Sequence, residues 1–229
     1  MTTNESILTQ TTEFSANGIS VPGYLARPAN IASAPAIILI QEWWGLNDHI
    51  KDIARRYAAE GFITAAVDLY DGVVTKEASE ASHLMSGLDF PKALSRLTAT
   101  IEYLRNLEGV TSIGVTGFCM GGVLSLLTAC QNKIEAVAPF YGMPDDLSAI
   151  ANLGCPMLFI GGEKDQWITV EKMNNLKEAL QTNNKIGEVR IYAGADHAFF
   201  NDTRPEVYNA GDANDAWAQV LTFFRENLK

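Results

Sequence analysis

The 229-residue sequence has few cysteines and no excess of basic residues, and each shortage excludes a class of protein. Its three cysteines, Cys119, Cys130 and Cys155, are too few and the wrong number for a disulfide framework. Lys and Arg total 17 against 27 Asp and Glu, which gives a formal net charge of −10. A chain with this charge and no basic cluster is a poor partner for phosphate backbones or anionic lipids, so we expect no nucleic-acid partner and no membrane partner.

Long apolar runs and metal-ligand spacings are also missing. The longest apolar stretches, such as APAIILI, have the length of a strand and fall far short of the roughly 20 residues that a membrane helix needs. The first residues show no basic segment followed by an apolar one, so we expect no signal peptide and a cytoplasmic protein. Neither the cysteines nor the three histidines have ligand spacing, and no phosphate-binding loop follows a strand. We therefore expect no metal and no cofactor.

The sequence instead alternates strand-like and helix-like segments over its whole length. This alternation, with no linker between segments, predicts a single α/β domain over residues 1–229, with a mostly parallel central sheet and helices on both faces. Residues 70–91 show no clear periodicity and are a candidate flap over a functional site. Strands are predicted at residues 19–27, 36–41, 62–68, 112–116, 134–139, 157–161 and 189–193, and helices after Asn47 or Asp48 and at 94–104, 120–131, 170–181 and 213–227.

The most informative motif is the segment GFCMGG, which carries Cys119 between a predicted strand and a predicted helix. A nucleophile elbow needs this arrangement, because a sharp turn lifts one side chain off the strand end and small neighbours relieve the crowding. The following helix points its N-terminus at the site, where it stabilises a thiolate or a developing oxyanion. Taken alone, the pattern also fits a buried thiol in a Gly-rich turn.

An acid and a histidine follow the cysteine in the order that such enzymes use. Asp165 comes just after the predicted strand 157–161, and His197 just after the strand 189–193. Because the carboxyl ends of parallel strands meet at one edge of a sheet, the three side chains are predicted to lie together. Other acidic residues near strand ends leave the choice of acid open, namely Asp145, Asp146, Glu163 and Asp196. The other histidines, His49 and His83, fall on a predicted helix and on the flap.

The segments GFCMGG, GGEKD, GADHAF, QEWWG and VDLY resemble those of the dienelactone hydrolase family, and the resemblance covers nearly the whole chain. It implies an α/β-hydrolase fold and the cofactor-free hydrolysis of a small ester or lactone through an acyl-cysteine intermediate. It also implies the roles of three residues. Cys119 is the nucleophile, His197 the general base and acid, and Asp165 the residue that orients the imidazole.

Glu42 comes directly after the predicted strand 36–41, where a nucleophile elbow needs a backbone donor for the oxyanion hole. By that reasoning the backbone N–H groups of Trp43 and Met120 hold the oxyanion. The family resemblance implies a separate catalytic role for Glu42. Its carboxylate contacts the resting thiol of Cys119 and keeps it protonated until the substrate displaces the carboxylate, and a nearby negative charge has that effect on a thiol.

The sequence departs from the family at two arginines that bind a substrate carboxylate, whose places are taken by Gly72 and Asn201. A buried carboxylate would lack a charged partner there, so a neutral or differently charged ester or lactone is expected, held by aromatic walls. The candidate substrate-binding residues are Tyr70, Phe118, Phe199, Asn201 and Arg204. A scaffold that binds a ligand without turnover is the alternative function, and a redox thiol is a weaker one because no resolving cysteine lies nearby in sequence.

Overall fold

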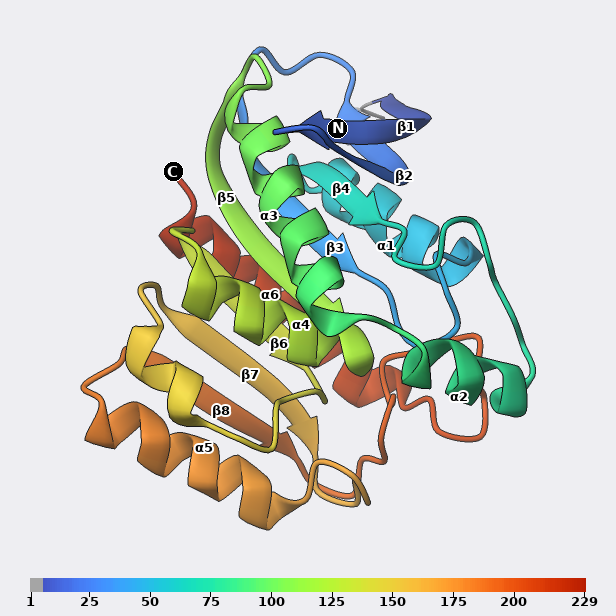
Figure 1. Cartoon of the computed structure of the whole chain (residues 1–229). Helices are drawn as coiled ribbons and strands as arrows, with labels where there is room; N and C mark the ends of the chain where they lie inside the picture. Colours follow the sequence, from blue (N-terminus) through green and yellow to red (C-terminus); the bar gives the residue numbers. More distant parts are fainter. Residues whose placement is uncertain (1–5) are drawn as a thin grey trace. The chain divides into compact units, whose positions relative to one another are not determined.

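The computed structural model describes residues 6–229, in which eight strands and six α-helices follow one another along the chain (Figure 1). The chain divides into two compact units. The first comprises the residues up to Gly114 together with Lys229, and the second comprises Val115–Leu228. The boundary falls inside strand β5 (Val110–Phe118) and not in a linker. The prediction of one domain over residues 1–229 stays a prediction.

The first unit contains four strands in the order β1-β2-β4-β3. Strands β1 and β2 form an antiparallel hairpin, β2 pairs antiparallel with β4, and β4 pairs parallel with β3. The hairpin turns at Asn17 and Gly18, whose φ angles of 52° and 77° are those of a tight two-residue turn. Their bounds are Ile7–Ala16 for β1, Ile19–Pro28 for β2, Ala34–Ile40 for β3 and Ile63–Val67 for β4.

Three helices belong to the same unit, α1 (Asp48–Ala59), α2 (Ala78–Ser86) and α3 (Phe90–Arg105), and α1 and α3 cover the four strands. Helix α1 packs on β2 and β4, and α3 packs on β1 and β2 from the opposite face (Figure 1). Of the two predicted caps of α1, Asn47 takes the position, and its Oδ1 accepts a hydrogen bond of 3.1 Å from the backbone N–H of Ile50. Strand β3 is almost wholly buried, as its β-branched run predicts.

Two predictions for the first unit are wrong. Strand β1 was not predicted, because its Thr-rich segment leaves most side chains exposed and lacks a buried run. Residues 70–91 are not irregular throughout, since they include the whole of α2 and the start of α3. Helix α2 buries only Ala81, so it has no apolar stripe from which a 3.6-residue period could be recognised.

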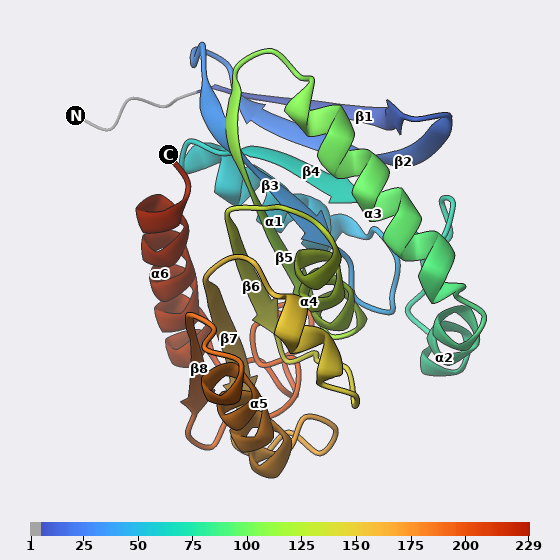
Figure 2. The same cartoon turned by 60° about the vertical axis from the view of Figure 1, so that its left-hand side comes forward.

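The second unit is built on parallel strands in the order β5-β6-β7-β8. Figure 2 shows α4 and α5 on one face of these strands and α6 on the other. The helix expected at 120–131 forms with those bounds, and the others differ from prediction by a few residues at their ends. The elements are β6 (Ala136–Phe140), β7 (Met157–Gly162), β8 (Gly187–Tyr192), α4 (Met120–Gln131), the 3-10 helix η1 (Ser148–Asn152), α5 (Val170–Thr182) and α6 (Ala210–Asn227).

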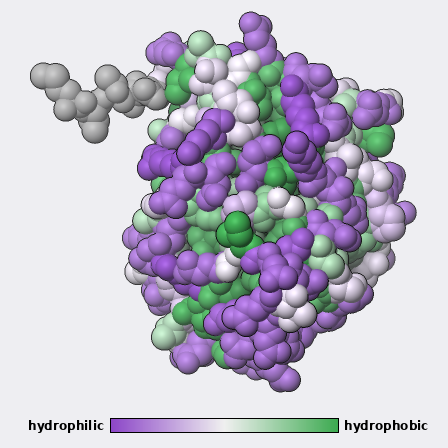
Figure 3. All heavy atoms as spheres, turned by 90° about the vertical axis from the view of Figure 1, so that its left-hand side faces the viewer, coloured by the Kyte–Doolittle hydropathy of each residue, from purple (hydrophilic) through white to green (hydrophobic). Residues whose placement is uncertain are grey.

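The observed class is therefore the predicted one, an α/β fold with a mostly parallel sheet and helices on both faces. Hydrophilic side chains cover most of the face drawn in Figure 3, with small hydrophobic patches among them. Within residues 6–229, no helix has the length and apolar content to cross a membrane.

Candidate active site

Cys119 stands at a sharp turn between β5 and α4, in the second unit. Its backbone angles, φ 55° and ψ −116°, lie where a residue with a side chain is rarely found, at a cost on the order of 1–3 kcal/mol. Backbone hydrogen bonds hold it there. Its N–H donates to the carbonyl of Phe140 at 3.1 Å, and its own carbonyl accepts from Gly122 and Val123 at 2.9 and 3.2 Å. The side chain is partly exposed, as a nucleophile must be.

Two glycines make room for this turn. A Cβ on Gly142, just after β6, would lie 1.9 Å from the carbonyl oxygen of Cys119. A Cβ on Gly122, in the first turn of α4, would lie 2.5 Å from the carbonyl oxygen of Phe140. Both contacts are with backbone atoms and cannot be relieved by a side-chain movement. The strained conformation of Cys119 therefore depends on Gly122 and Gly142.

Helix α4 begins directly after Cys119, and no side chain caps its N-terminus. The first turn of a helix carries a partial positive charge and N–H groups without partners inside the helix. Cys119 occupies the capping position of this helix. Met120 is the first residue of this helix, and the oxyanion role expected of its backbone N–H stays a prediction.

His197 and Asp165 lie together on two loops that follow β8 and β7. The Nδ1 atom of His197 is 2.7 Å from Oδ2 of Asp165, whose side chain is fully buried. The other carboxylate oxygen accepts hydrogen bonds from the backbone N–H groups of Trp167 and Ile168 at 2.8 and 2.9 Å. This arrangement fixes the carboxylate, and it makes Nδ1 of His197 the donor nitrogen. The Nε2 atom is then available to the Cys119 thiol, with which His197 also makes a side-chain hydrogen bond.

The environment of His197 raises the pKa of its imidazole from 6.5 to about 10. Burial acts in the opposite direction and lowers it, and this is the largest single influence. The hydrogen bonds to Asp165 and Cys119, and the attraction of the two charges, outweigh burial because they favour the imidazolium. The histidine can therefore hold a proton at neutral pH.

The titration of His197 gives a direct test of this coupling. Because its pKa is raised, the imidazolium form should persist through neutral pH and be lost only as the pH approaches about 10. Asp165→Asn removes a group that favours the charged form, so it should lower the pKa of His197. The measurement is a proton NMR titration of the imidazole. Asp145→Asn is the matched control, because Asp145 is a carboxylate of the same unit paired with Lys172. An equal shift in both variants would contradict a specific pair.

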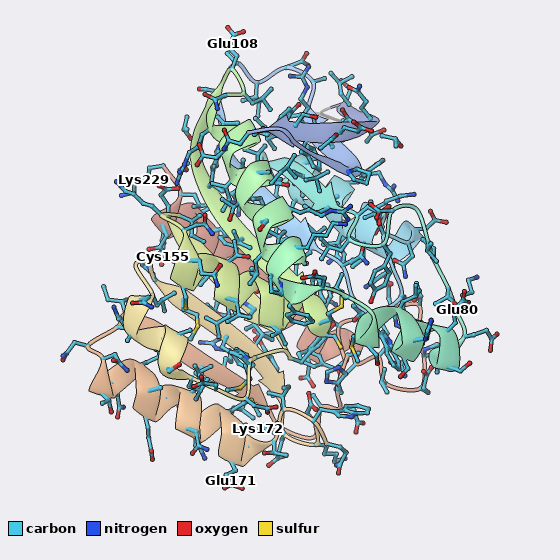
Figure 4. All side chains as sticks on the ribbon, in the orientation of Figure 1. Glu80, Glu108, Cys155, Glu171, Lys172 and Lys229 are labelled. Carbon is cyan, nitrogen blue, oxygen red and sulfur yellow. The ribbon has the colours of Figure 1, made fainter. Side chains whose placement is uncertain are left out.

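Three of the four other acidic residues near strand ends have partners other than His197. Oδ1 of Asp145 accepts from Nζ of Lys172 at 2.7 Å, and Lys172 is labelled at the start of α5 in Figure 4. Asp146 caps η1 through the backbone N–H and hydroxyl of Ser148. The Glu163 carboxylate accepts from the N–H of Gly194 at 2.8 Å. Among the open alternatives, the geometry thus brings Asp165 to His197.

Two aromatic side chains contact His197, and one of them, Tyr141, was not expected near the site from the sequence. The rings of Tyr141 and Trp167 lie 5.0 and 4.8 Å from the imidazole, both edge to face. Tyr141 has a positive φ of 36° and is fully buried, whereas Trp167 is 66% exposed. Tyr141 directly follows β6, the neighbour of β7 in the sheet. This position at a strand end is the feature of the sequence that could have indicated its place near His197. Trp167 presents apolar surface to solvent beside the imidazole.

The predicted substrate-binding residues of the second unit are mostly internal. Phe118 and Phe199 are fully buried, and Phe118 stacks on Phe200 within an aromatic cluster. Asn201 is also buried, and its Oδ1 accepts from the backbone N–H and the hydroxyl of Thr203 at 3.1 and 2.7 Å, so it shapes a turn.

Arg204, by contrast, is partly exposed. Its Nε donates to the Glu206 carboxylate at 2.8 Å. Substrate-binding roles for Phe118, Phe199, Asn201 and Arg204 stay predictions.

The remaining candidates belong to the first unit. Glu42 is buried two residues after the end of β3, and Trp43 packs edge to face on Trp44 with ring centroids 4.9 Å apart. Tyr70 is buried in a turn in which its N–H donates to Oδ1 of Asp68 at 2.9 Å. The roles expected of Glu42, Trp43 and Tyr70 stay predictions.

The two other cysteines are internal. Cys130 lies on α4 and Cys155 precedes β7, where Figure 4 labels it, and burial raises the pKa of their thiols to about 11 and about 12. Such thiols are poor nucleophiles at neutral pH. In the part of the chain that the structure describes, no group of three or more His, Cys, Asp or Glu side chains is placed to hold a metal ion.

Comparison with known proteins places the chain in a family. The family model described as "Dienelactone hydrolase family" matches residues 21–228. "Protein usf" of Aquifex pyrophilus is 35% identical, over 96% of this chain and 99% of that protein. A protein of Aquifex aeolicus named "Putative carboxymethylenebutenolidase" is 32% identical over the same shares of the two chains. The crystal structure of a protein from Klebsiella pneumoniae, described as a "Putative Dienelactone Hydrolase", superposes with a TM-score of 0.88 at 28% identity, over 96% of this chain and 99% of that one.

The fold, the site and these relatives define a carboxylic ester hydrolase with an α/β fold. The chain belongs to the dienelactone hydrolase family.

Proposed function

We propose that the protein hydrolyses a small ester or lactone through an acyl-cysteine intermediate, with Cys119 as nucleophile, His197 as general base and acid, and Asp165 as the residue that orients the imidazole. One observation carries the proposal: a buried carboxylate 2.7 Å from Nδ1 of a histidine whose other partner is a cysteine at a strained strand-to-helix turn. A scaffold that only binds a ligand has no need of this combination.

In the first half of the reaction, the Cys119 thiolate attacks the carbonyl carbon of the substrate. The new C–S bond gives a tetrahedral oxyanion, which the Met120 N–H and the positive end of α4 stabilise. The predicted second donor is the N–H of Trp43. The C–O bond then breaks, and His197 gives its proton to the leaving alkoxide oxygen. In a lactone this oxygen stays attached to the acyl group.

In the second half, water cleaves the acyl-cysteine. His197, now neutral, takes a proton from the water as its oxygen attacks the thioester carbonyl. The C–S bond breaks, the thiolate leaves, and the imidazolium–thiolate pair is restored. Asp165 favours the imidazolium in both halves, because its buried carboxylate faces Nδ1.

A substrate screen tests the proposal. p-Nitrophenyl esters and small lactones, with and without a carboxylate, should include compounds that are turned over without added cofactor. Dienelactone, which carries a carboxylate, should be turned over poorly with a high KM, because Gly72 and Asn201 stand where the family has arginines and Asn201 is already engaged in a turn. Binding of such compounds without any hydrolysis would favour the ligand-binding alternative.

Trp167 is expected to bind the apolar part of the substrate. Its exposed indole lies beside His197, and the bond from its backbone N–H to Asp165 fixes its position. Trp167→Ala should raise KM about tenfold for an aryl or long-chain ester, roughly the loss of 1.4 kcal/mol of apolar contact. It should leave the KM of a small acetyl ester nearly unchanged. Trp167→Phe is the control and should keep most of the binding. Equal losses for both substrates would contradict a role in selecting the substrate.

Glu42 provides a separate prediction, which rests on the family resemblance. If its carboxylate suppresses the thiolate of the resting enzyme, Glu42→Gln should speed the alkylation of Cys119 by iodoacetamide near neutral pH. Turnover should nonetheless fall, because the variant lacks the carboxylate that accepts a proton when the substrate binds. Alkylation rates measured between about pH 6 and 9, on either side of the ordinary thiol pKa, provide the test. Identical rates in the two proteins would show that Glu42 and Cys119 are not coupled.

A further inference from the structure

Among residues 6–229, strand β8 ends the row of strands in the second unit and leaves one edge unpaired. It pairs with β7 on one side only, while α5 and α6 lie over its two faces (Figure 2). At the start of the strand, Gly187 and Glu188 are exposed, and the preceding Ile186 is 74% exposed. An open strand edge presents backbone donors and acceptors that can pair with another chain.

The hydrogen bonds to β7 show which residues of β8 face the open edge. The carbonyls of Ile186 and Tyr192 both accept bonds from the β7 side, from Met157 at 3.1 Å and from Glu163 at 2.9 Å. Backbone groups alternate in direction along a strand, so Glu188 and Arg190 also point toward β7. The N–H and C=O groups of Gly187, Val189 and Ile191 therefore point outward.

The side chains of β8 carry a charge pattern that is complementary to itself. Glu188 and Arg190 lie on the same face, within 2.8 Å of each other, and both line a groove of about 370 Å³ between the strand and α6. Their side chains are 58% and 33% exposed.

We propose that a second copy of this chain pairs with β8 along this edge, antiparallel, with Val189 opposite Val189 of the other copy. This register joins the outward-facing residues in hydrogen-bonded pairs, Gly187 with Ile191 and Val189 with Val189. It also sets Glu188 of each copy directly opposite Arg190 of the other, so two opposite-charge pairs form about the two-fold axis.

The neighbouring registers are disfavoured by the same charges. Shifting the two-fold axis by one residue sets Glu188 opposite itself or Arg190 opposite itself. Like charges in directly opposed positions destabilise a strand pair, whereas opposite charges stabilise it by roughly 0.2–1 kcal/mol each. The sequence Glu-Val-Arg thus selects one antiparallel register, and the partner it selects is an identical strand.

Sedimentation velocity of the full chain over a range of concentrations tests this dimer. The wild type should show a concentration-dependent dimer. Glu188→Arg should raise its dissociation constant about tenfold or more, because two attractive pairs become two repulsive ones. The double variant Glu188→Arg/Arg190→Glu is the matched control and should restore the dimer, since it exchanges the charges without changing their pattern. Circular dichroism checks that each variant is folded.

A second variant tests the backbone pairing independently of charge. Ile191→Pro removes an outward-facing N–H and leaves the bonds to β7 in place, so it should also weaken the dimer. A wild type that sediments as a monomer at every concentration would overturn the proposal. So would a dimer that neither Glu188→Arg nor Ile191→Pro weakens. The readout is mass, so the result is independent of the proposed hydrolysis.

Discussion

Cys119→Ala should lower kcat/KM for every substrate found by on the order of a thousandfold or more. The variant removes the sulfur that forms the covalent intermediate, and no other thiol is placed to replace it. The expected loss follows from the position of Cys119, which is a partly exposed residue held at a strained turn at the N-terminus of α4. Initial rates on the best ester, together with labelling by a thiol-directed reagent, measure the effect.

The other cysteines serve as matched controls. Cys130→Ala and Cys155→Ala should keep activity and Cys119 labelling, because both thiols are buried and their pKa values are raised to about 11 and about 12. The labelling of folded protein should disappear only in Cys119→Ala. Near-wild-type rates in Cys119→Ala would exclude a cysteine mechanism and would require another nucleophile.

Asp165→Asn should lower kcat by on the order of a thousandfold while leaving the protein folded. An amide keeps the shape of the carboxylate but loses its charge, so the imidazolium of His197 is no longer favoured. The amide can also donate its NH₂ to Nδ1. The imidazole would then carry its proton on Nε2, which is the wrong tautomer for a base that acts through Nε2. Activity and folding should be measured on the same preparation, because Asp165 also accepts bonds from two backbone N–H groups.

Asp145→Asn is again the control for Asp165→Asn and should retain most of the activity, since Asp145 pairs with the exposed Lys172. The double variant Cys119→Ala/Asp165→Asn should be little worse than Cys119→Ala alone, because the two residues act as a unit. Additive losses would show that Asp165 supports the rate by a route that does not involve the cysteine.

Much of the fold could be predicted from periodicity because its buried elements have strong patterns. The apolar run of β3 and the nearly all-apolar α4 were predicted close to their observed bounds. Strand β1 and helix α2 were missed, since each exposes most of its side chains and their stability comes from pairing or packing with neighbours. Local sequence carries little of that information.

The candidate site likewise has some features that the sequence predicts and others that it does not. The strand-end positions of Cys119, Asp165 and His197 follow from chain order, so the sequence could indicate them. The sequence also favoured Asp165 over Glu163, but it could not show which carboxylate the loop turns toward His197. The contacts of Tyr141 and Trp167 with His197 also arise from loop conformation, which has no periodic signal.

Mass spectrometry of the acid-quenched enzyme tests the central claim most directly. Wild-type protein mixed with an activated ester should carry the acyl group on the peptide that contains Cys119, and the adduct should disappear as the substrate is consumed. The adduct should be absent in Cys119→Ala and should accumulate when His197 is replaced by alanine if acylation still occurs, because deacylation needs the base. Hydrolysis with no adduct on Cys119, or with the acyl group on another residue, would contradict the acyl-cysteine mechanism.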